Sequence, residues 1–339
     1  MGAKGAIRAG DGALPRDAPF RHEAMLYAGP AQFVAATASF VRDSLAAEEP
    51  VMVAVIAPRR DLLREELGAD ADHVHFIDME DVGRNPARII PAWQEWVDRN
   101  SSPSNSPRTF RGIGEPIWLG RTAAELVECQ QHESLLNTAF DTGPGWWLVC
   151  PYDTESLDES VIDRARQSHP SAISGTAQLP ATEYPHPDLS HESMFAELLP
   201  EAFPEAGTRL FETAFALGDL FRLRETVAAR ATAAGLTANR VDDLVLAVNE
   251  LMCNSIQHGG GTGTLRLWQE AGVLVGEVHD RGLVRDPLVG RIRPEGTGQG
   301  GAGVWMANHL CDLVQIRSAP AAGTTVRVQM ALPISEVGR

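Results

Sequence analysis

Three polar residues at regular spacing, Glu250, Asn254 and His258, stand out in the second half of the chain. Residues four apart lie side by side on a helix, so this spacing predicts a polar strip along one helix surface. A carboxylate can orient or deprotonate a hydroxyl group, and an amide oxygen is a ligand for a hard cation such as Mg²⁺. Taken alone, however, the spacing favours a helix face exposed to water.

Three further segments add groups of the kind that a nucleotide needs. Asp280-x-Gly282 offers a carboxylate that can accept a hydrogen bond from an exocyclic amine, and its glycine lets the backbone approach closely. Residues 296–303 (GTGQGGAG) precede a helix, and backbone N–H groups there can bind phosphate without a lysine. Gly323-Thr-Thr325 opens the last strand and can add a hydroxyl. Each segment, taken singly, is also typical of an ordinary turn or flexible loop.

The apolar pattern around these residues predicts the elements that position them. We expect helices over 217–234, 241–257 and 304–311, and strands over 209–216, 265–268, 273–278, 314–317 and 325–332. Within the central helix, one face is apolar except for a serine: Val241, Leu244, Val245, Val248, Met252 and Ser255. The polar strip lies opposite that face. Hairpins beside a few long helices predict an α+β sandwich.

The first half of the chain has a different pattern, in which helices alternate with apolar runs. We expect helices over 30–45, 86–99, 122–139 and 157–167, and strands over 51–57, 74–79 and 146–149. Continuous apolar runs are typical of strands buried on both faces of a parallel sheet, so this half is predicted to be an α/β domain. Its residues Glu125, Glu128, His132 and Glu133 do not have the spacing of a known zinc motif, and we interpret them as an exposed helix face.

Changes in composition divide the chain into four parts. Residues 1–17 are small and polar and are predicted to be a disordered tail, followed by the α/β domain over 18–170. Residues 171–204 are rich in proline and are predicted to be a linker that contains a short helix over 192–199. The α+β domain then covers 205–335, and residues 101–107 (SSPSNSP) are predicted to be a surface loop in the first domain.

The overall composition excludes several classes of protein. Only one of the 29 Lys and Arg residues is a lysine, Lys4, which excludes a Walker-A loop, a eukaryotic-type kinase and Schiff-base chemistry. The net charge of −16 argues against a nucleic-acid partner, and no apolar run is long enough to cross a membrane. Four widely spaced cysteines indicate reduced thiols in a cytoplasmic protein: Cys129, Cys150, Cys253 and Cys311.

In this order and at these separations, the four polar segments resemble the boxes of the GHKL (Bergerat) ATP-binding fold, and residues 205–335 are most similar to the RsbW-type anti-sigma-factor serine kinases. The resemblance implies ATP and Mg²⁺ as cofactors. Asn254 would hold Mg²⁺, His258 would close the same box, and Glu250 would orient or deprotonate the nucleophile. The remaining implied ligands are Asp280 and Gly282 for adenine, Thr325 through water, and Gly298, Gly301 and Gly303 for the phosphates. Leu283 or Val284 stands where the Asp280 box usually has a second glycine.

Residues 20–169 resemble the MEDS sensory domain, a RecA-like α/β module. The residues that carry this resemblance are His22, Tyr27, Arg111–Trp118 (RGIGEPIW), Gly120, Arg121, Glu125, Cys129, His132, Glu133, Asn137 and Phe140. It implies a parallel sheet whose P-loop is degenerate, because Tyr27–Pro30 is no Walker-A loop. We therefore expect a binding or docking domain, and a small-molecule ligand is left open.

Together the two halves resemble the RsbA family of anti-sigma regulators. The expected function is that of an ATP-dependent serine kinase in a partner-switching system, which phosphorylates an anti-anti-sigma factor of the STAS type and binds a sigma factor. Direct nucleic-acid and membrane partners are not expected, and a homodimer is left open. One alternative is a non-catalytic regulator gated by nucleotide. Another is a sensor histidine kinase, although the prolines around His191 exclude the long helix that a phosphoacceptor histidine needs.

Overall fold

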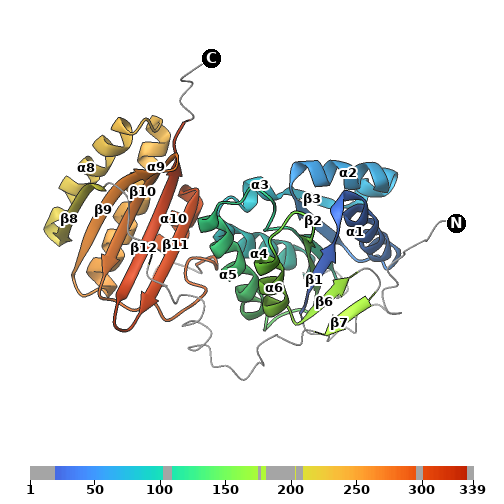
Figure 1. Cartoon of the computed structure of the whole chain (residues 1–339). Coiled ribbons are helices and arrows are strands. Elements are labelled where there is room, and N and C mark those ends of the chain that lie inside the picture. The colour runs from blue at the N-terminus through green and yellow to red at the C-terminus, as the bar shows by residue number, and fades with distance from the viewer. Residues whose placement is uncertain are drawn as a thin grey trace, which may run out of the picture. The chain divides into compact units, whose positions relative to one another are not determined.

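The computed structural model of the chain describes residues 20–101, 109–174, 177–180, 203, 209–294 and 301–333. These residues belong to two compact units, divided between His186 and Pro187 (Figure 1). The predicted tail 1–17, the loop residues 102–107 and the helix 192–199 lie outside the described residues. Among the helices that are described, none combines the length and apolar character needed to cross a membrane.

The first unit is built on a seven-stranded sheet with the order β3-β2-β4-β5-β1-β6-β7. Its strands are β1 Arg21–Tyr27, β2 Val51–Val55, β3 His75–Asp78, β4 Arg111–Gly114, β5 Trp147–Asp153, β6 Ser171–Ser174 and β7 Ala177–Pro180. Neighbouring strands run parallel except β6 and β7. The predicted α/β domain with a parallel sheet is confirmed. The sheet also extends into the segment predicted as a linker, because β6 pairs with β1.

Helices cover both faces of this sheet (Figure 1). They are α1 Gly29–Ala46, α2 Ala57–Leu67, α3 Met79–Val82, α4 Ile89–Asn100, α5 Ala123–Ala139 and α6 Glu159–Ser168. Phe33 of α1 and Leu63 of α2 belong to one buried cluster with strand residues such as Val53. On the other face, the indole of Trp93 in α4 lies so close to β4 that a Cβ at Gly112 would come within 2.7 Å of it. The glycine in this strand therefore makes room for the indole.

The second unit is an antiparallel five-stranded sheet with the order β11-β12-β10-β9-β8. Its strands are β8 Arg209–Ala216, β9 Thr262–Glu270, β10 Val273–Asp280, β11 Leu313–Ala319 and β12 Gly323–Ala331. Its helices are α8 Leu220–Ala233, α9 Ala238–His258 and α10 Ala302–Leu310. Each of the predicted helices and strands of this half is present, and the predicted α+β sandwich is confirmed.

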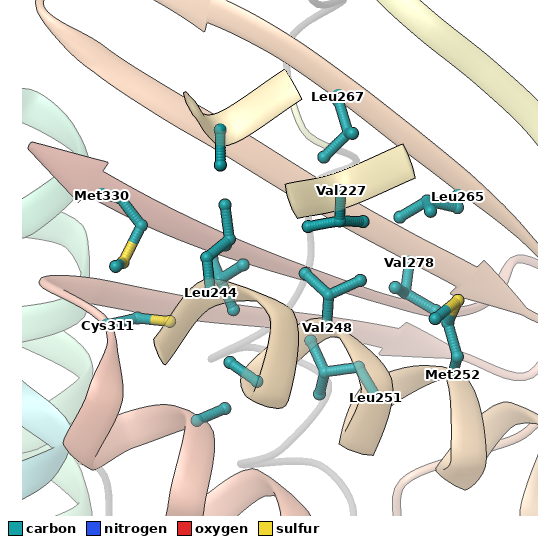
Figure 2. Close-up of a cluster of buried hydrophobic side chains, with 14 of the residues drawn as sticks. Val227, Leu244, Val248, Leu251, Met252, Leu265, Leu267, Val278, Cys311 and Met330 are labelled. Carbon is teal, nitrogen blue, oxygen red and sulfur yellow. The ribbon is translucent and has the colours of Figure 1, made fainter. Parts of the chain in front are cut away.

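Helix α9 forms the centre of the second core. Figure 2 shows Leu244, Val248 and Leu251 of this helix among apolar side chains that come from the sheet. Of the predicted core face, Val245 is half-buried and the other five residues, including Ser255, are buried. Burial of large apolar side chains contributes about 1.5–3 kcal/mol each. This core therefore fixes the rotation of α9, and with it the direction of the polar strip on the opposite side.

Candidate functional site

The polar strip of α9 lies partly beneath α10. A Cβ added to Gly303, in the first turn of α10, would come within 3.1 Å of Glu250 Oε2 and 3.2 Å of Asn254 Nδ2. Glu250 and Asn254 are half-buried, whereas His258, at the end of α9, is exposed. Glu250 and Asn254 therefore face the start of another helix rather than open solvent. Any residue larger than glycine at position 303 would press on both of them.

Asp280 at the end of β10 is held by two hydrogen bonds. Ser255 Oγ donates to its Oδ2 over 2.6 Å, and the backbone N–H of Gly282 donates to its Oδ1 over 2.7 Å. A Cβ at Gly259 would overlap this carboxylate, so glycine is needed there as well. A carboxylate has about four lone-pair sites, so two of them stay available to a donor from a ligand. The two hydrogen bonds therefore fix the position of the Asp280 carboxylate and leave it able to accept a further hydrogen bond.

Ser255 is a candidate site residue that the sequence did not single out as one. It lies on the buried face of α9, as predicted, but its hydroxyl donates to Asp280 over 2.6 Å and shares this proton with the carbonyl oxygen of Leu251 at 3.2 Å. The available signal was a serine among Leu, Val and Met on an apolar face. Because Ser255 directly follows Asn254, the same turn of α9 contacts both Gly303 and Asp280.

The register of β12 places Thr324, and not Thr325, on the same side of the sheet as Asp280. Asp280 lies opposite Thr324 and His279 lies opposite Thr325. Thr324 Oγ1 donates to the carbonyl oxygen of Gly282 over 2.9 Å. The hydroxyl of Thr325, in contrast, lies 2.9 Å from His279 Nδ1. Since adjacent strand residues point to opposite faces, the hydroxyl beside the carboxylate belongs to Thr324.

Gly301 and Gly303 lie at the start of α10, where they leave the backbone N–H groups open to a ligand. Gly301 has a φ of 101°, a left-handed conformation that favours glycine. The first turn of a helix has N–H groups without partners inside the helix, and its dipole attracts anions. Asn308 of α10 donates to the carbonyl oxygen of Gly290 over 2.8 Å and so ties the segment before it to the helix. The predicted phosphate ligand Gly298 lies outside the described residues.

The groups that meet around α9 fit a nucleotide with its metal ion. An amide oxygen such as that of Asn254 is a suitable ligand for Mg²⁺, which takes its other ligands from phosphate oxygens and water. The start of α10 offers backbone donors to those phosphates. Asp280 offers an acceptor to an amine. Glu250 lies beside Asn254, where a base for an attacking hydroxyl group would be needed.

The first unit places a second set of polar residues in its interior. Glu128, His132 and Glu133 of α5 are buried, so the interpretation of this helix as an exposed face is wrong. Helix α5 packs against both α4 and α6, which covers more than one of its sides. Glu125 is half-exposed and instead caps the helix together with Thr122. Glu133 lies beside His22 and His169, both of which are also buried.

The turn from β1 into α1 faces two carboxylates. The backbone N–H of Gly29 donates to Asp153 Oδ1 over 3.2 Å, and a Cβ at Gly29 would come within 2.9 Å of Glu155 Oε2. Anions favour such a helix start, and here side chains of the chain itself supply them. A phosphate at this turn would meet two negative charges, which is unfavourable. The described part of the turn therefore offers no support for nucleotide binding in the first unit.

Comparison with known protein families assigns a family to each unit. Residues 21–170 match MEDS, the MEthanogen/methylotroph, DcmR Sensory domain. Residues 214–330 match the histidine kinase-like ATPase domain. No match to a curated protein was found. The predicted architecture, a MEDS domain followed by a GHKL-type ATPase domain, is thus confirmed, and it is that of a regulatory ATPase or kinase.

Proposed function

We propose that the second unit binds ATP with Mg²⁺ and acts as a protein serine/threonine kinase under the control of the first. The observation that carries the proposal is the contact of Glu250 and Asn254 with Gly303, where a candidate base, a candidate metal ligand and a helix start meet. On a helix face exposed to water, polar side chains do not need a glycine of another helix packed against them. The match to the histidine kinase-like ATPase domain covers all three residues.

Each group has a separate task in the proposed reaction. Asn254 holds Mg²⁺, which neutralises charge on the phosphates, and the start of α10 with Gly301 and Gly303 binds the phosphate oxygens. Asp280 accepts a hydrogen bond from the adenine amine, while Gly282 and Thr324 keep the end of β10 in place. Glu250 accepts the proton of the attacking serine hydroxyl. His258 belongs to the same motif as Glu250 and Asn254, and Gly298 to the same phosphate-binding motif as Gly301 and Gly303.

The partners are proposed from the resemblance to anti-sigma regulators. In this proposal the kinase phosphorylates an STAS-type anti-anti-sigma factor, binds a sigma factor in the alternative state, and works in the cytoplasm. The MEDS domain fits a sensory input, and a small molecule is the class of ligand proposed for it. The support from the chain itself is that a sensory domain is joined to a kinase-like ATPase domain.

The experiment is a phosphotransfer assay with purified full-length protein, ATP, Mg²⁺ and an STAS-type protein from the same genome. Mass spectrometry should find phosphate on a serine or threonine of the partner, and Glu250→Gln should slow its appearance about 10²- to 10⁴-fold. Glu225→Gln is the matched control, because Glu225 is an exposed carboxylate on a different helix, α8. ATP binding without any transfer would favour the non-catalytic regulator. Acid-labile phosphate on a histidine would favour the histidine kinase, and absence of ATP binding would contradict both the kinase and its alternatives.

A further inference from the structure

Four side chains of types that can bind metal ions converge inside the first unit, far from the proposed ATP site in the sequence. They are His22 of β1, Glu133 of α5, Cys150 of β5 and His169, which follows α6. Their nearest donor atoms, one from each residue, all lie within 4.8 Å of one another. All four residues are buried, and His22, Glu133 and His169 are at most 1% exposed. This donor set combines two nitrogens, an oxygen and a sulfur.

The distances in this cluster are close to those of a tetrahedral metal site. His22 Nε2 lies 3.1 Å from Glu133 Oε2 and 3.3 Å from Cys150 Sγ. His169 Nε2 lies 3.2 Å from the same Oε2. Zn²⁺ binds nitrogen, oxygen and sulfur at about 2.0–2.3 Å, and tetrahedral angles then separate the ligand atoms by about 3.3–3.8 Å. Three of the six distances are thus near these values, and all six are at most 4.8 Å, so small side-chain movements would complete the geometry.

The hydrogen bonds around the cluster turn the Nε2 lone pairs of both histidines toward its centre. His169 Nδ1 lies 2.7 Å from the carbonyl oxygen of Ala165, which can only accept, so Nδ1 carries the proton. His22 Nδ1 lies 3.1 Å from Asn137 Oδ1. The Asn137 amide is oriented by its own Nδ2, which donates to the carbonyl oxygen of Ser168 over 2.9 Å. Metal-binding histidines commonly have this outer partner on the second nitrogen.

With both histidines neutral and no cation bound, this arrangement is electrostatically unfavourable. In the neutral histidines, two nitrogen lone pairs would face the carboxylate oxygen of Glu133 at 3.1 Å and 3.2 Å. The other carboxylate oxygen, Oε1, and His169 Nε2 are both buried without a hydrogen-bond partner. A buried polar atom without a partner is costly, and buried charges are normally paired or bound to a metal. A four-coordinate cation at the centre would bind Oε2 of Glu133 and the Nε2 atom of each histidine, and so balance the buried charge of this carboxylate.

We propose that His22, Glu133, Cys150 and His169 form a closed, four-coordinate site for a divalent transition metal ion, with Zn²⁺ as the best match to the donor set. Four protein ligands leave no open position, which is the arrangement of a structural site rather than a catalytic one. The ion would join β1, β5, α5 and the end of α6, so it would stabilise the fold of the MEDS domain. The proposal does not depend on the kinase function of the second unit.

The test begins with the full-length protein, purified with a tag that contains no histidine. Elemental analysis should find about one Zn²⁺ per chain, and a chain stripped with chelator should regain one equivalent with a rise in Tm. Co²⁺ in place of Zn²⁺ should give the visible bands of a four-coordinate ion and a near-ultraviolet thiolate band. Cys150→Ser should lose the thiolate band, whereas Cys129→Ser should keep it, because Cys129 is also buried but bonds to Pro116 instead.

Two further variants keep the proposal testable if a ligand variant fails to fold. Asn137→Ala removes the outer partner of His22, together with the hydrogen bond to Ser168, and leaves all four proposed ligands in place. Loss of such an outer partner typically weakens metal binding about 10- to 100-fold. His309→Gln changes an exposed histidine of α10 and should leave metal affinity unchanged. The proposal is overturned if the folded wild-type chain takes up no stoichiometric Zn²⁺ or Co²⁺. It is equally overturned if Cys150→Ser binds Co²⁺ with an unchanged spectrum.

Discussion

The polar clusters of the two units differ in how they are enclosed and in what they are made of. In the first unit, His22, Glu133, Cys150 and His169 are all buried, and side chains supply every donor atom. In the second unit, Glu250 and Asn254 are half-buried, and glycines bring the backbone close to them. A closed cluster of side chains suits an ion that stays bound. A half-open site lined by backbone suits a ligand that must enter, react and leave.

Because of this difference, substitutions in the two clusters are expected to change different measurable properties. Changes in the buried cluster should alter metal content and the free energy of unfolding, because the groups there have no solvent to replace a lost partner. Changes at the half-open site should alter nucleotide binding or phosphotransfer and leave folding largely intact, since water can replace what is lost. The predictions below test this separation, beginning with the largest expected effect.

The largest effect is expected for Glu250→Gln. If Glu250 is the base, phosphotransfer should slow by about 10²- to 10⁴-fold, the usual contribution of a positioned acid or base. Tm should stay within the range of the exposed control Glu225→Gln, because Glu250 is half-buried and its isosteric replacement fills the same space. Single-turnover kinetics and thermal unfolding measure the two quantities. A large drop in Tm, or equal slowing in the control, would remove the distinction between the two regions.

Asp280→Asn should affect binding more than chemistry. Hydrogen bonds to charged groups contribute about 1.5–3 kcal/mol, so ATP affinity should fall about 10- to 100-fold. GTP has a carbonyl group where ATP has the amine, so the wild type should prefer ATP, and the variant should lose much of that preference. Calorimetric titration with both nucleotides measures this, with Asp242→Asn, an exposed carboxylate of α9, as the control. An unchanged preference would show that Asp280 does not contact the base.

Gly259→Ala tests whether the backbone is as important in this site as side chains are in the other. The added Cβ would overlap the Asp280 carboxylate, and overpacking of this kind costs about 1–3 kcal/mol. We expect weaker ATP binding together with a modest loss of stability. Gly218→Ala is the matched control, because nothing lies within 4 Å of a Cβ there and its φ is not positive. Equal ATP affinity in the two variants would contradict the close approach described for Gly259.

The second unit was the easier one to predict because its signals are local. Glu250, Asn254 and His258 lie within nine residues of one helix, and the hairpin turns carry their own glycines. Which threonine lies beside Asp280 was not predictable in the same way. Thr324 and Thr325 are adjacent, so a shift of one residue in strand register exchanges them between faces. The roles of Glu250 and Gly298 stay predictions.

The buried cluster of the first unit could not be predicted, because its members are distant in sequence. His22 and His169 are separated by almost the whole unit, and neither has a spacing to Glu133 that a motif could capture. Helix α5 is buried on more than one side, so its polar residues do not segregate onto one face. Strand β4 (RGIG) also escaped prediction, because glycine is uncommon in strands. Its glycines are required here by the close approach of the Trp93 indole, which the sequence does not reveal.

The last prediction concerns Glu115, another buried carboxyl group of the first unit. Burial raises its pKa to about 8, although Arg59, whose Nε lies 2.8 Å from the carboxyl oxygen, lowers the pKa in part. In the unfolded chain the group ionises near its ordinary value of 4.5. Between about pH 4.5 and pH 8 the unfolded state therefore loses a proton that the folded state keeps, so the free energy of unfolding should fall as the pH rises.

Glu115→Gln should flatten that dependence, because the neutral amide removes the proton difference between the two states. The change in slope is at most about 1.4 kcal/mol per pH unit, since one proton is involved. Denaturant unfolding at several pH values between 5 and 8 measures it, with Glu65→Gln, an exposed carboxylate of α2, as the control. If Glu115→Gln and Glu65→Gln both keep the wild-type slope, burial does not change the protonation of Glu115 on folding. The contrast between the two regions would then rest on the metal cluster alone.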